Sequence, residues 1–146
     1  MRVVIQRVTQ GMVEVDARNI GEIGNGYVVL LGVHKDDEER DAVYLAEKTA
    51  MLRIFEDENG RLNRSIIEVE GSILSISQFT LYADYKKGRR PSFTEAADVN
   101  KAKFLYNVYN LKLREFGISV KEGKFQSMMR VSIINDGPVT IVMDSR

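Results

Sequence analysis

The sequence predicts an α+β fold: a mostly antiparallel sheet or partial β-barrel flanked by two helices, in a single domain over residues 1–146. Short runs rich in Val and Ile predict strands, and two longer segments with apolar residues at helical spacing predict the helices. A chain of 146 residues is the usual length of one domain, and it contains no internal repeat, linker or low-complexity tract.

The N-terminal part of the chain predicts three strands. Residues 1–9 are rich in Val and Ile, and residues 12–17 alternate apolar and polar side chains, as in a strand with one solvent-exposed face. Asn19 with Gly21 suggests a turn, and the run Gly24-Asn25-Gly26 suggests a tight turn into residues 27–33. That last run is apolar on both faces, which predicts a buried central strand.

Two helices are predicted from caps and apolar stripes. Asp36 or Asp37 can cap the first helix, which we expect to end near residues 53–55. Asp98 or Asn100 can open the second helix, and Gly117 suits its C-terminal end. The apolar stripe of the first helix consists of Ala42, Leu45, Ala46, Thr49 and Leu52. The apolar stripe of the second consists of Phe104, Leu105, Val108 and Leu111.

The remaining segments alternate between turns and strands. Residues 56–60 end in Asn-Gly, a pair that favours a turn because glycine adopts positive φ easily. Residues 72–79 predict a strand, and residues 83–97 are polar and contain glycine, which predicts a loop. The closing strands are expected at 118–120, 128–134 and 139–143.

The composition excludes several kinds of site. The chain has no cysteine, which excludes disulfides, thiolate nucleophiles and cysteine-based metal sites. Its single histidine, His34, cannot build a usual zinc site, and we expect a strand-end histidine rather than a member of a catalytic triad. A dinucleotide fingerprint and a P-loop are both absent from the sequence. We therefore expect a site without metal or cofactor.

Charge and hydropathy restrict the partners. Lys plus Arg and Asp plus Glu number 21 each, so an RNA contact must come from a local patch, and Lys86-Lys87-Gly88-Arg89-Arg90 is the candidate. Charge runs of this kind are more often solvated faces. Apolar runs stay well short of the ~20 residues that span a bilayer, and the first residues lack the features of a signal peptide. We expect a cytoplasmic protein without membrane contact.

The first of two informative motifs is Ser77-Gln78-Phe79-Thr80-Leu81, which follows an apolar run. A hydroxyl at the end of a strand, such as that of Thr80, can point into a cleft. Threonine is a poor nucleophile without a neighbouring base, and the sequence supplies no obvious one, so a role in positioning water or substrate suits Thr80 better. The alternative, that Ser77 and Thr80 only satisfy the end of a sheet, has equal standing from the spacing.

The second motif is Asn135-Asp136-Gly137-Pro138-Val139-Thr140. Proline cannot donate a backbone hydrogen bond, so Pro138 marks an edge, a bulge or a turn. Because only ~5–6% of X-Pro bonds in folded proteins are cis, the residues by themselves predict a trans bond. In a cis bond, the carbonyls of Gly137 and Pro138 could face one ligand and form a rigid acceptor pair suited to an ammonium group.

At these two motifs the chain closely resembles the D-aminoacyl-tRNA deacylases, also called D-tyrosyl-tRNA deacylases. The resemblance covers essentially the whole length, and the two motifs occur in the right order and spacing. Further matching segments are Ile5-Gln6-Arg7-Val8, Gly32-Val33, Leu52-Arg53-Ile54-Phe55 and the stretch from Gly88 through Arg90-Pro91-Ser92-Phe93.

The resemblance implies a barrel-like α+β homodimer that hydrolyses the ester joining a D-amino acid to the 3′ end of tRNA. It implies a cis Gly137-Pro138 bond that enters the partner subunit's site, where its carbonyls hold the α-amino group and exclude L-side chains. Arg7 would fix the orientation of that loop. The residues that would line the pocket around the ester are Ser77, Gln78, Phe79 and Thr80.

The resemblance leaves two routes for the chemical step. Thr80 could act as the nucleophile, or the 2′-hydroxyl of the RNA could help to activate water while Thr80 and Gln78 contribute position and the protein supplies oxyanion donors. We favour the second route, because no base is visible near Thr80 in the sequence.

The chain departs from the family pattern in one segment. Relatives usually carry Phe-Gly-Ala-x-Met before the last strands, whereas this chain reads Phe125-Gln126-Ser127-Met128-Met129. Phe125 and Met129 match as pocket residues, but Gln126 and Ser127 are larger or more polar, which affects the floor of the pocket. Two functions of other classes remain: a non-catalytic module that holds the RNA end, and a structural dimer whose motifs serve its interface.

Overall fold

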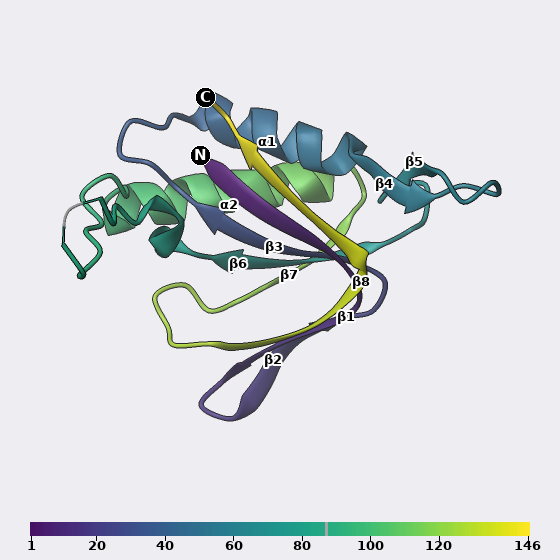
Figure 1. Cartoon of the computed structure of the whole chain (residues 1–146), viewed down its shortest axis with the longest axis horizontal. Helices are drawn as coiled ribbons and strands as arrows, with labels where there is room; N and C mark the ends of the chain where they lie inside the picture. Colours follow the sequence, from purple (N-terminus) through teal and green to yellow (C-terminus); the bar gives the residue numbers. More distant parts are fainter. Residues whose placement is uncertain (87) are drawn as a thin grey trace.

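The computed structural model describes residues 1–86 and 88–146. Two helices lie side by side over one face of a strongly curved, nearly closed sheet of six strands (Figure 1). The helical elements are α1 (Glu39–Met51), the single 3-10 turn η1 (Phe79–Tyr82) and α2 (Val99–Glu115). The strands are β1 (Arg2–Val15), β2 (Arg18–Ile23), β3 (Gly26–Gly32), β4 (Arg53–Glu56), β5 (Leu62–Ser65), β6 (Ser72–Ser77), β7 (Ser119–Glu122) and β8 (Arg130–Asp144).

The main sheet is built around the long strand β1. Along one edge β1 pairs antiparallel with β3 and then with β2, and along the other edge it pairs antiparallel with β8. β3 pairs parallel with β6, and β6 pairs parallel with β7. β4 and β5 form a separate antiparallel hairpin. The predicted α+β fold with a partial barrel is confirmed, although the sheet is mixed, with parallel pairing from β3 through β6 to the edge strand β7.

The N-terminal hairpin turns earlier than the sequence predicts. The two expected N-terminal strands form the single strand β1, and the turn after it lies at Asp16 and Ala17, whose φ angles are 50° and 60°. Positive φ at both central residues gives a turn whose twist matches that of the strands it joins. Asn19 and Gly21, which were expected to form the turn, lie inside β2. β3 confirms the predicted buried strand, but the tight turn expected at residues 24–26 is wrong. β2 and β3 follow one another along the same edge of β1 in the same direction, so Gly24 and Asn25 form only a bend between them.

The N-terminal end of α1 lies beyond the predicted caps. Glu38 occupies the N-cap position, rather than Asp36 or Asp37. Asp37 is fully buried, and its two carboxylate oxygens contact the Met1 ammonium at 2.6 Å and the His34 N–H at 2.6 Å. Both oxygens are therefore engaged in tying the chain start to the end of β3, which explains why Asp37 does not cap the helix.

The C-terminal end of α1 also differs from the prediction. The helix ends at Met51, ahead of the expected 53–55, because residues 53–56 enter β4. Its predicted stripe is buried for the four residues within the helix, Ala42, Leu45, Ala46 and Thr49. The predicted turn after β4 is confirmed, and its Gly60 has a φ of 71°.

α2 begins and ends as predicted, but it buries a different face. The Asp98 carboxylate accepts hydrogen bonds from two N–H groups of the first turn at 2.9 and 3.1 Å, and Gly117 follows the helix with a φ of 80°. Leu105 of the predicted stripe is buried, whereas Phe104 and Leu111 are 54% and 59% exposed. The buried face consists of Leu105, Tyr106, Tyr109, Asn110 and Leu113.

The last strand is continuous where two strands were expected. β8 runs from Arg130 to Asp144, and its register against β1 shifts on both sides of Val8, beside the second motif. β6 ends at Ser77, and the residues after it form η1 rather than extending the strand to Phe79. Within the described residues, no helix is long and apolar enough to cross a membrane.

Candidate functional site

A cavity of about 830 Å³ lies where β6, η1, the start of α2 and the segment before β8 meet. Most of its wall is apolar, and its polar side chains come from the first motif and from Gln126 and Ser127 before β8. The residues from the predicted site that line it are Ser77, Gln78, Phe79, Thr80, Phe125 and Met129. Other lining residues include Val33, Phe93, Ala97, Ala102, Tyr106 and Gln126. The fold thus brings together two segments that are almost fifty residues apart in the sequence.

The first motif turns sharply where β6 ends. The Gln78 N–H donates to the Leu31 carbonyl at 2.7 Å, which ties the motif to β3, and Thr80 then lies in η1 rather than at a strand end. The Gln78 side-chain amide donates a hydrogen bond to the Thr80 hydroxyl oxygen. Because that oxygen accepts a hydrogen bond from Gln78, the hydroxyl proton of Thr80 points away from the Gln78 amide. Among the described residues, no base is bonded to the Thr80 side chain.

Aromatic side chains shape the walls of the cavity. The Phe79 ring is 57% exposed and meets the Phe93 ring edge-on, with centroids 5.0 Å apart. The Tyr106 ring lies 6.0 Å from that of Phe125, and its hydroxyl donates to the Ser75 carbonyl at 2.8 Å. Burial raises the pKa of Tyr106, so the phenol stays neutral and acts as a fixed wall.

The second motif does not line this cavity of its own chain. Gly137 and Pro138 are exposed, and the bond between them is cis, which corrects the trans bond expected from frequencies and agrees with the family resemblance. Gly137 has a φ of 118°, and a Cβ there would lie 2.8 Å from Val139 Cγ2, 3.0 Å from Val139 N and 3.1 Å from Arg7 Nη2. Only glycine fits this position without displacing backbone.

Arg7 holds the second motif from the inside of the fold. Its side chain is 5% exposed, its Nη1 donates to the Ile54 carbonyl at 2.6 Å, and its Nε lies 3.1 Å from Asp136 Oδ2. The Asn135 side-chain amide donates to the Arg7 carbonyl at 2.7 Å. One guanidinium therefore links β1, β4 and the Gly137-Pro138 segment.

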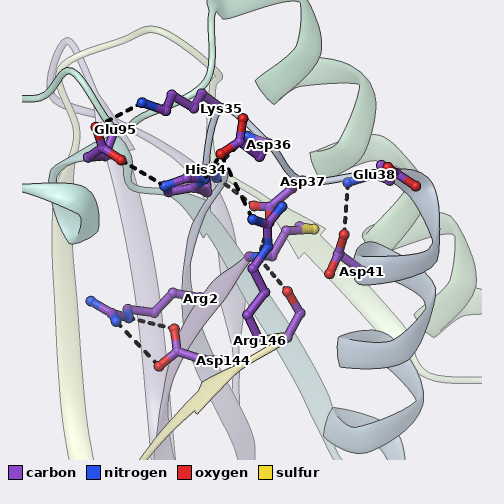
Figure 2. A network of polar contacts seen from close by, with 12 residues as sticks. Arg2, His34, Lys35, Asp36, Asp37, Glu38, Asp41, Glu95, Asp144 and Arg146 are labelled. Carbon is purple, nitrogen blue, oxygen red and sulfur yellow. Dashed lines mark hydrogen bonds and ion pairs between the residues drawn. The ribbon is translucent and has the colours of Figure 1, made fainter.

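A further polar network joins residues 34–35 to Glu95, next in the chain to the lining residues Val33 and Ala96 (Figure 2). His34 Nε2 lies 3.1 Å from Glu95 Oε2, and Lys35 Nζ lies 2.9 Å from Glu95 Oε1. These hydrogen bonds lower the pKa of the Glu95 carboxyl below its usual range. Backbone bonds from Lys35 N to Glu95 O and from Ala97 N to Val33 O, each 2.9 Å, fasten the same two segments. His34 lies at a strand end, as predicted, and pairs with Ala96.

Comparison with known proteins decides the family. A family model described as D-Tyr-tRNA(Tyr) deacylase matches residues 4–144. The chain belongs to this deacylase family. It is 56% identical over 146 residues to a D-aminoacyl-tRNA deacylase of Bacillus pumilus (strain SAFR-032), covering all of this chain and 99% of the relative. It is 54% identical over 145 residues to that of Shouchella clausii (strain KSM-K16), covering 99% of each chain. The resemblance inferred from the motifs is confirmed.

Two solved structures share the fold. A structure described as a c-Myc DNA unwinding element binding protein superposes with a TM-score of 0.93 at 39% identity, covering 100% of this chain and 99% of the other. A probable eukaryotic D-amino acid tRNA deacylase superposes with a TM-score of 0.84 at 19% identity over 98% of both chains, a likeness that shows the fold alone.

In this member of the deacylase family, the residues predicted for the site form two separate groups. One group lines the cavity, and the other, consisting of Arg7, Gly137 and Pro138, lies elsewhere on the same chain. Sequence reasoning missed Glu95 and Tyr106. Glu95 offers no sequence signal, whereas Tyr106 and Tyr109 are three apart on a helix and indicate a buried face. The described residues contain no group of three or more side chains suited to a metal ion.

Proposed function

We propose that this protein hydrolyses the ester bond of D-aminoacyl-tRNA and so removes D-amino acids before they enter translation. The observation that carries the proposal is the cavity lined by Ser77–Thr80 in a chain that matches the deacylase family over residues 4–144. Water adds to the ester carbonyl carbon, and the bond from that carbon to the ribose oxygen breaks. One proton of the water leaves on the ribose oxygen, as the hydroxyl of free tRNA. The D-amino acid leaves as its carboxylate, and the second proton passes to solvent.

The chemical step is assigned to water with help from the RNA, rather than to a protein nucleophile. The Thr80 oxygen accepts a hydrogen bond from the Gln78 amide, and no base among the described residues is hydrogen-bonded to the Thr80 hydroxyl. The first N–H groups of a helical turn have no partner within that turn, and η1 begins at the cavity. These amides suit the oxyanion that forms on the ester carbonyl. The ribose 2′-hydroxyl then orients the water.

Chiral selection is assigned to the second motif acting in a homodimer. Gly137 and Pro138 are exposed and lie outside their own chain's cavity, so we place them in the cavity of a partner subunit. Their carbonyls would accept hydrogen bonds from the α-ammonium group of the substrate, and an L-side chain would then collide with backbone. Arg7 supports this role because it holds the segment from behind. Backbone held in this way cannot yield as a flexible side chain would.

We propose no metal or cofactor for this reaction. We place the protein in the cytoplasm, where charged tRNA is used. Phe125 and Met129 serve as apolar walls near the ester. Since the gate works by shape, the amino acid's own side chain is read weakly. Glycine has no L-side chain to exclude, so glycyl-tRNA is also a substrate.

The test is to mix the purified protein separately with D-tyrosyl-tRNA, L-tyrosyl-tRNA and glycyl-tRNA, and to follow release of the amino acid. Loss of the D-form and of glycine, with the L-form intact, is the expected result. Loss of both tyrosyl forms would leave an esterase without the gate, and an inert glycyl-tRNA would contradict selection by shape. Binding without turnover would favour a module that only holds the RNA end, and neither binding nor turnover would favour a structural dimer.

A further inference from the structure

We propose that Lys86, Arg89 and Arg90, in the hairpin that Asp84 and Ser92 close, bind the sugar-phosphate backbone of the tRNA acceptor end beside the cavity. The inference rests on the proposed function, which it extends from the terminal ester to the neighbouring nucleotides. These cations belong to the basic patch that the sequence offers as an RNA contact. The alternative interpretation is that the patch is only a solvated face of the protein. Lys86, Arg89 and Arg90 of that patch are described by the structure, and Lys87 lies outside the described residues.

The hairpin has a defined base. Asp84 and Ser92 exchange both backbone hydrogen bonds, each 2.8 Å, and so close the loop between them. The Asp84 carboxylate accepts a hydrogen bond from the Lys86 N–H at 3.0 Å. The single carboxylate of this segment is thus bonded to the backbone at the base.

The tip carries concentrated positive charge. Lys86, Arg89 and Arg90 are all exposed, and none of them takes part in the ion pairs found within residues 1–86 and 88–146. The whole chain has a formal net charge of zero, so its attraction for phosphate must be local. Tyr85, beside these cations, is 80% exposed. Exposed aromatic and cationic side chains together are typical of surfaces that bind single-stranded RNA.

The position of the hairpin relative to the cavity identifies the part of the RNA that it meets. Ser92 at its base is followed by Phe93, which lines the cavity and packs against Phe79. Figure 1 shows the described parts of the hairpin, on either side of residue 87, and the loop before β8 on the same side of the molecule. An RNA whose terminal ester occupies the cavity therefore continues past the hairpin, with its last phosphates close to Arg89 and Arg90.

The test compares two substrates that differ in phosphates. D-tyrosyl-adenosine carries the ester and no phosphate, whereas D-tyrosyl-tRNA carries both. For the double variant Arg89→Gln/Arg90→Gln we expect kcat/KM with D-tyrosyl-tRNA to fall about tenfold at low salt, through KM. The slope of log kcat/KM against log salt should become shallower by roughly 1.5, since two phosphate contacts are lost. Turnover of D-tyrosyl-adenosine should change by no more than about twofold, because that substrate has no phosphate to lose.

A control variant tests whether the effect is specific to the hairpin or follows from any loss of two positive charges. Arg40→Gln/Lys48→Gln removes the same charge from the exposed face of α1 and should leave both substrates unaffected. An equal loss in this control, or equal losses with both substrates in the hairpin variant, would overturn the proposal, and so would full activity of the hairpin variant with tRNA. Failure of the proposed function is a separate result, because the unaltered protein would then cleave neither D-ester.

Discussion

The two motifs differ in how firmly the chain holds them. In the first, Phe79 and Thr80 are exposed on a single helical turn, and the Thr80 side chain has one hydrogen bond, from Gln78. In the second, the segment around Gly137 is fastened to two strands by the buried Arg7. The groups assigned to the ester thus lie on a lightly held turn, whereas the groups assigned to chiral selection lie on fixed backbone. Selection by shape requires rigid backbone, whereas the Thr80 side chain is assigned only a positioning role.

Removing the guanidinium of Arg7 should have the largest effect on this contrast. Arg7→Met leaves the buried Ile54 carbonyl without its donor and Asp136 without its cation. We expect the free energy of unfolding to fall by about 3 kcal/mol, as measured by urea denaturation. We also expect cleavage of L-tyrosyl-tRNA to appear, because the segment behind Gly137 loses its support.

The matched control for Arg7 lies on the same strand. Arg2 pairs with Asp144 at 2.8 Å and donates to the Leu81 carbonyl at 3.2 Å, but the Arg2 and Asp144 side chains are both more than a third exposed. Arg2→Met should therefore cost at most about 1 kcal/mol, and it should leave the ratio of D- to L-substrate turnover unchanged. Equal losses of stability in the two variants would show that Arg7 is not a special anchor.

A methyl group at Gly137 tests the rigidity of the segment directly. The added Cβ meets Val139 N at 3.0 Å, and its φ of 118° is unfavourable for an L-residue. Gly137→Ala should cost roughly 2–3 kcal/mol and reduce discrimination between D- and L-tyrosyl-tRNA. Gly60→Ala, at a φ of 71° with open space around it, should cost about 1 kcal/mol without changing selectivity. Selectivity that survives in Gly137→Ala would remove this segment from the gate.

Local patterns predicted more of this molecule than long-range contacts did. The N-cap of α2 at Asp98, the glycine after that helix at Gly117 and the buried strand after Gly26 depend on neighbours in sequence, and they were found correctly. The buried face of α2 was wrong because apolar spacing gives no weight to the tyrosine hydroxyls, and those of Tyr106 and Tyr109 find partners inside the fold.

The site shows the same division. Ser77 and Thr80 could be predicted because they follow an apolar run within a recognisable motif. The bond between His34 and Glu95 could not, because it exists only after residues 33–35 pair with residues 95–97 across a long loop. The contact from Arg7 to the Ile54 carbonyl likewise joins strands that are 47 residues apart.

Thr80→Val tests the chemical role of the lightly held motif. If Thr80 only positions groups, the lost hydroxyl should lower kcat about fivefold, which corresponds to roughly 1 kcal/mol for one hydrogen bond. Thr80→Ser, which keeps the hydroxyl, should retain most of the rate. Abolished turnover in Thr80→Val, with D-aminoacyl-tRNA still bound, would make Thr80 the nucleophile and contradict the RNA-assisted step.

The contacts of Glu95 with His34 and Lys35 predict that the stability of the protein depends on pH. Lys35 and His34 lower the pKa of the Glu95 carboxyl, so its contribution to stability is present above the unfolded pKa and is lost as pH falls through the folded one. The difference in Tm between the unaltered protein and Glu95→Gln should therefore narrow below about pH 4. A difference in Tm that stays constant from neutral to acidic pH would show that the charge of the Glu95 carboxylate does not stabilise the fold.

Substitution of Gln126 should have the smallest effect, and it tests the cavity side of the comparison between the two motifs. It lines the cavity with a φ of 60°, at a position where the resemblance places glycine in relatives. Left-handed backbone costs an L-residue about 1–2 kcal/mol, and the greater chain entropy of glycine offsets part of the gain, so Gln126→Gly should stabilise the protein by roughly 0.5 kcal/mol. Glu70→Gly, at a φ of 51° away from the cavity, should give a similar gain. Only Gln126→Gly should change KM for D-tyrosyl-tRNA, because only Gln126 narrows the cavity. Equal KM values for Gln126→Gly and Glu70→Gly would mean that glutamine at position 126, in place of glycine, does not alter which substrates enter the cavity.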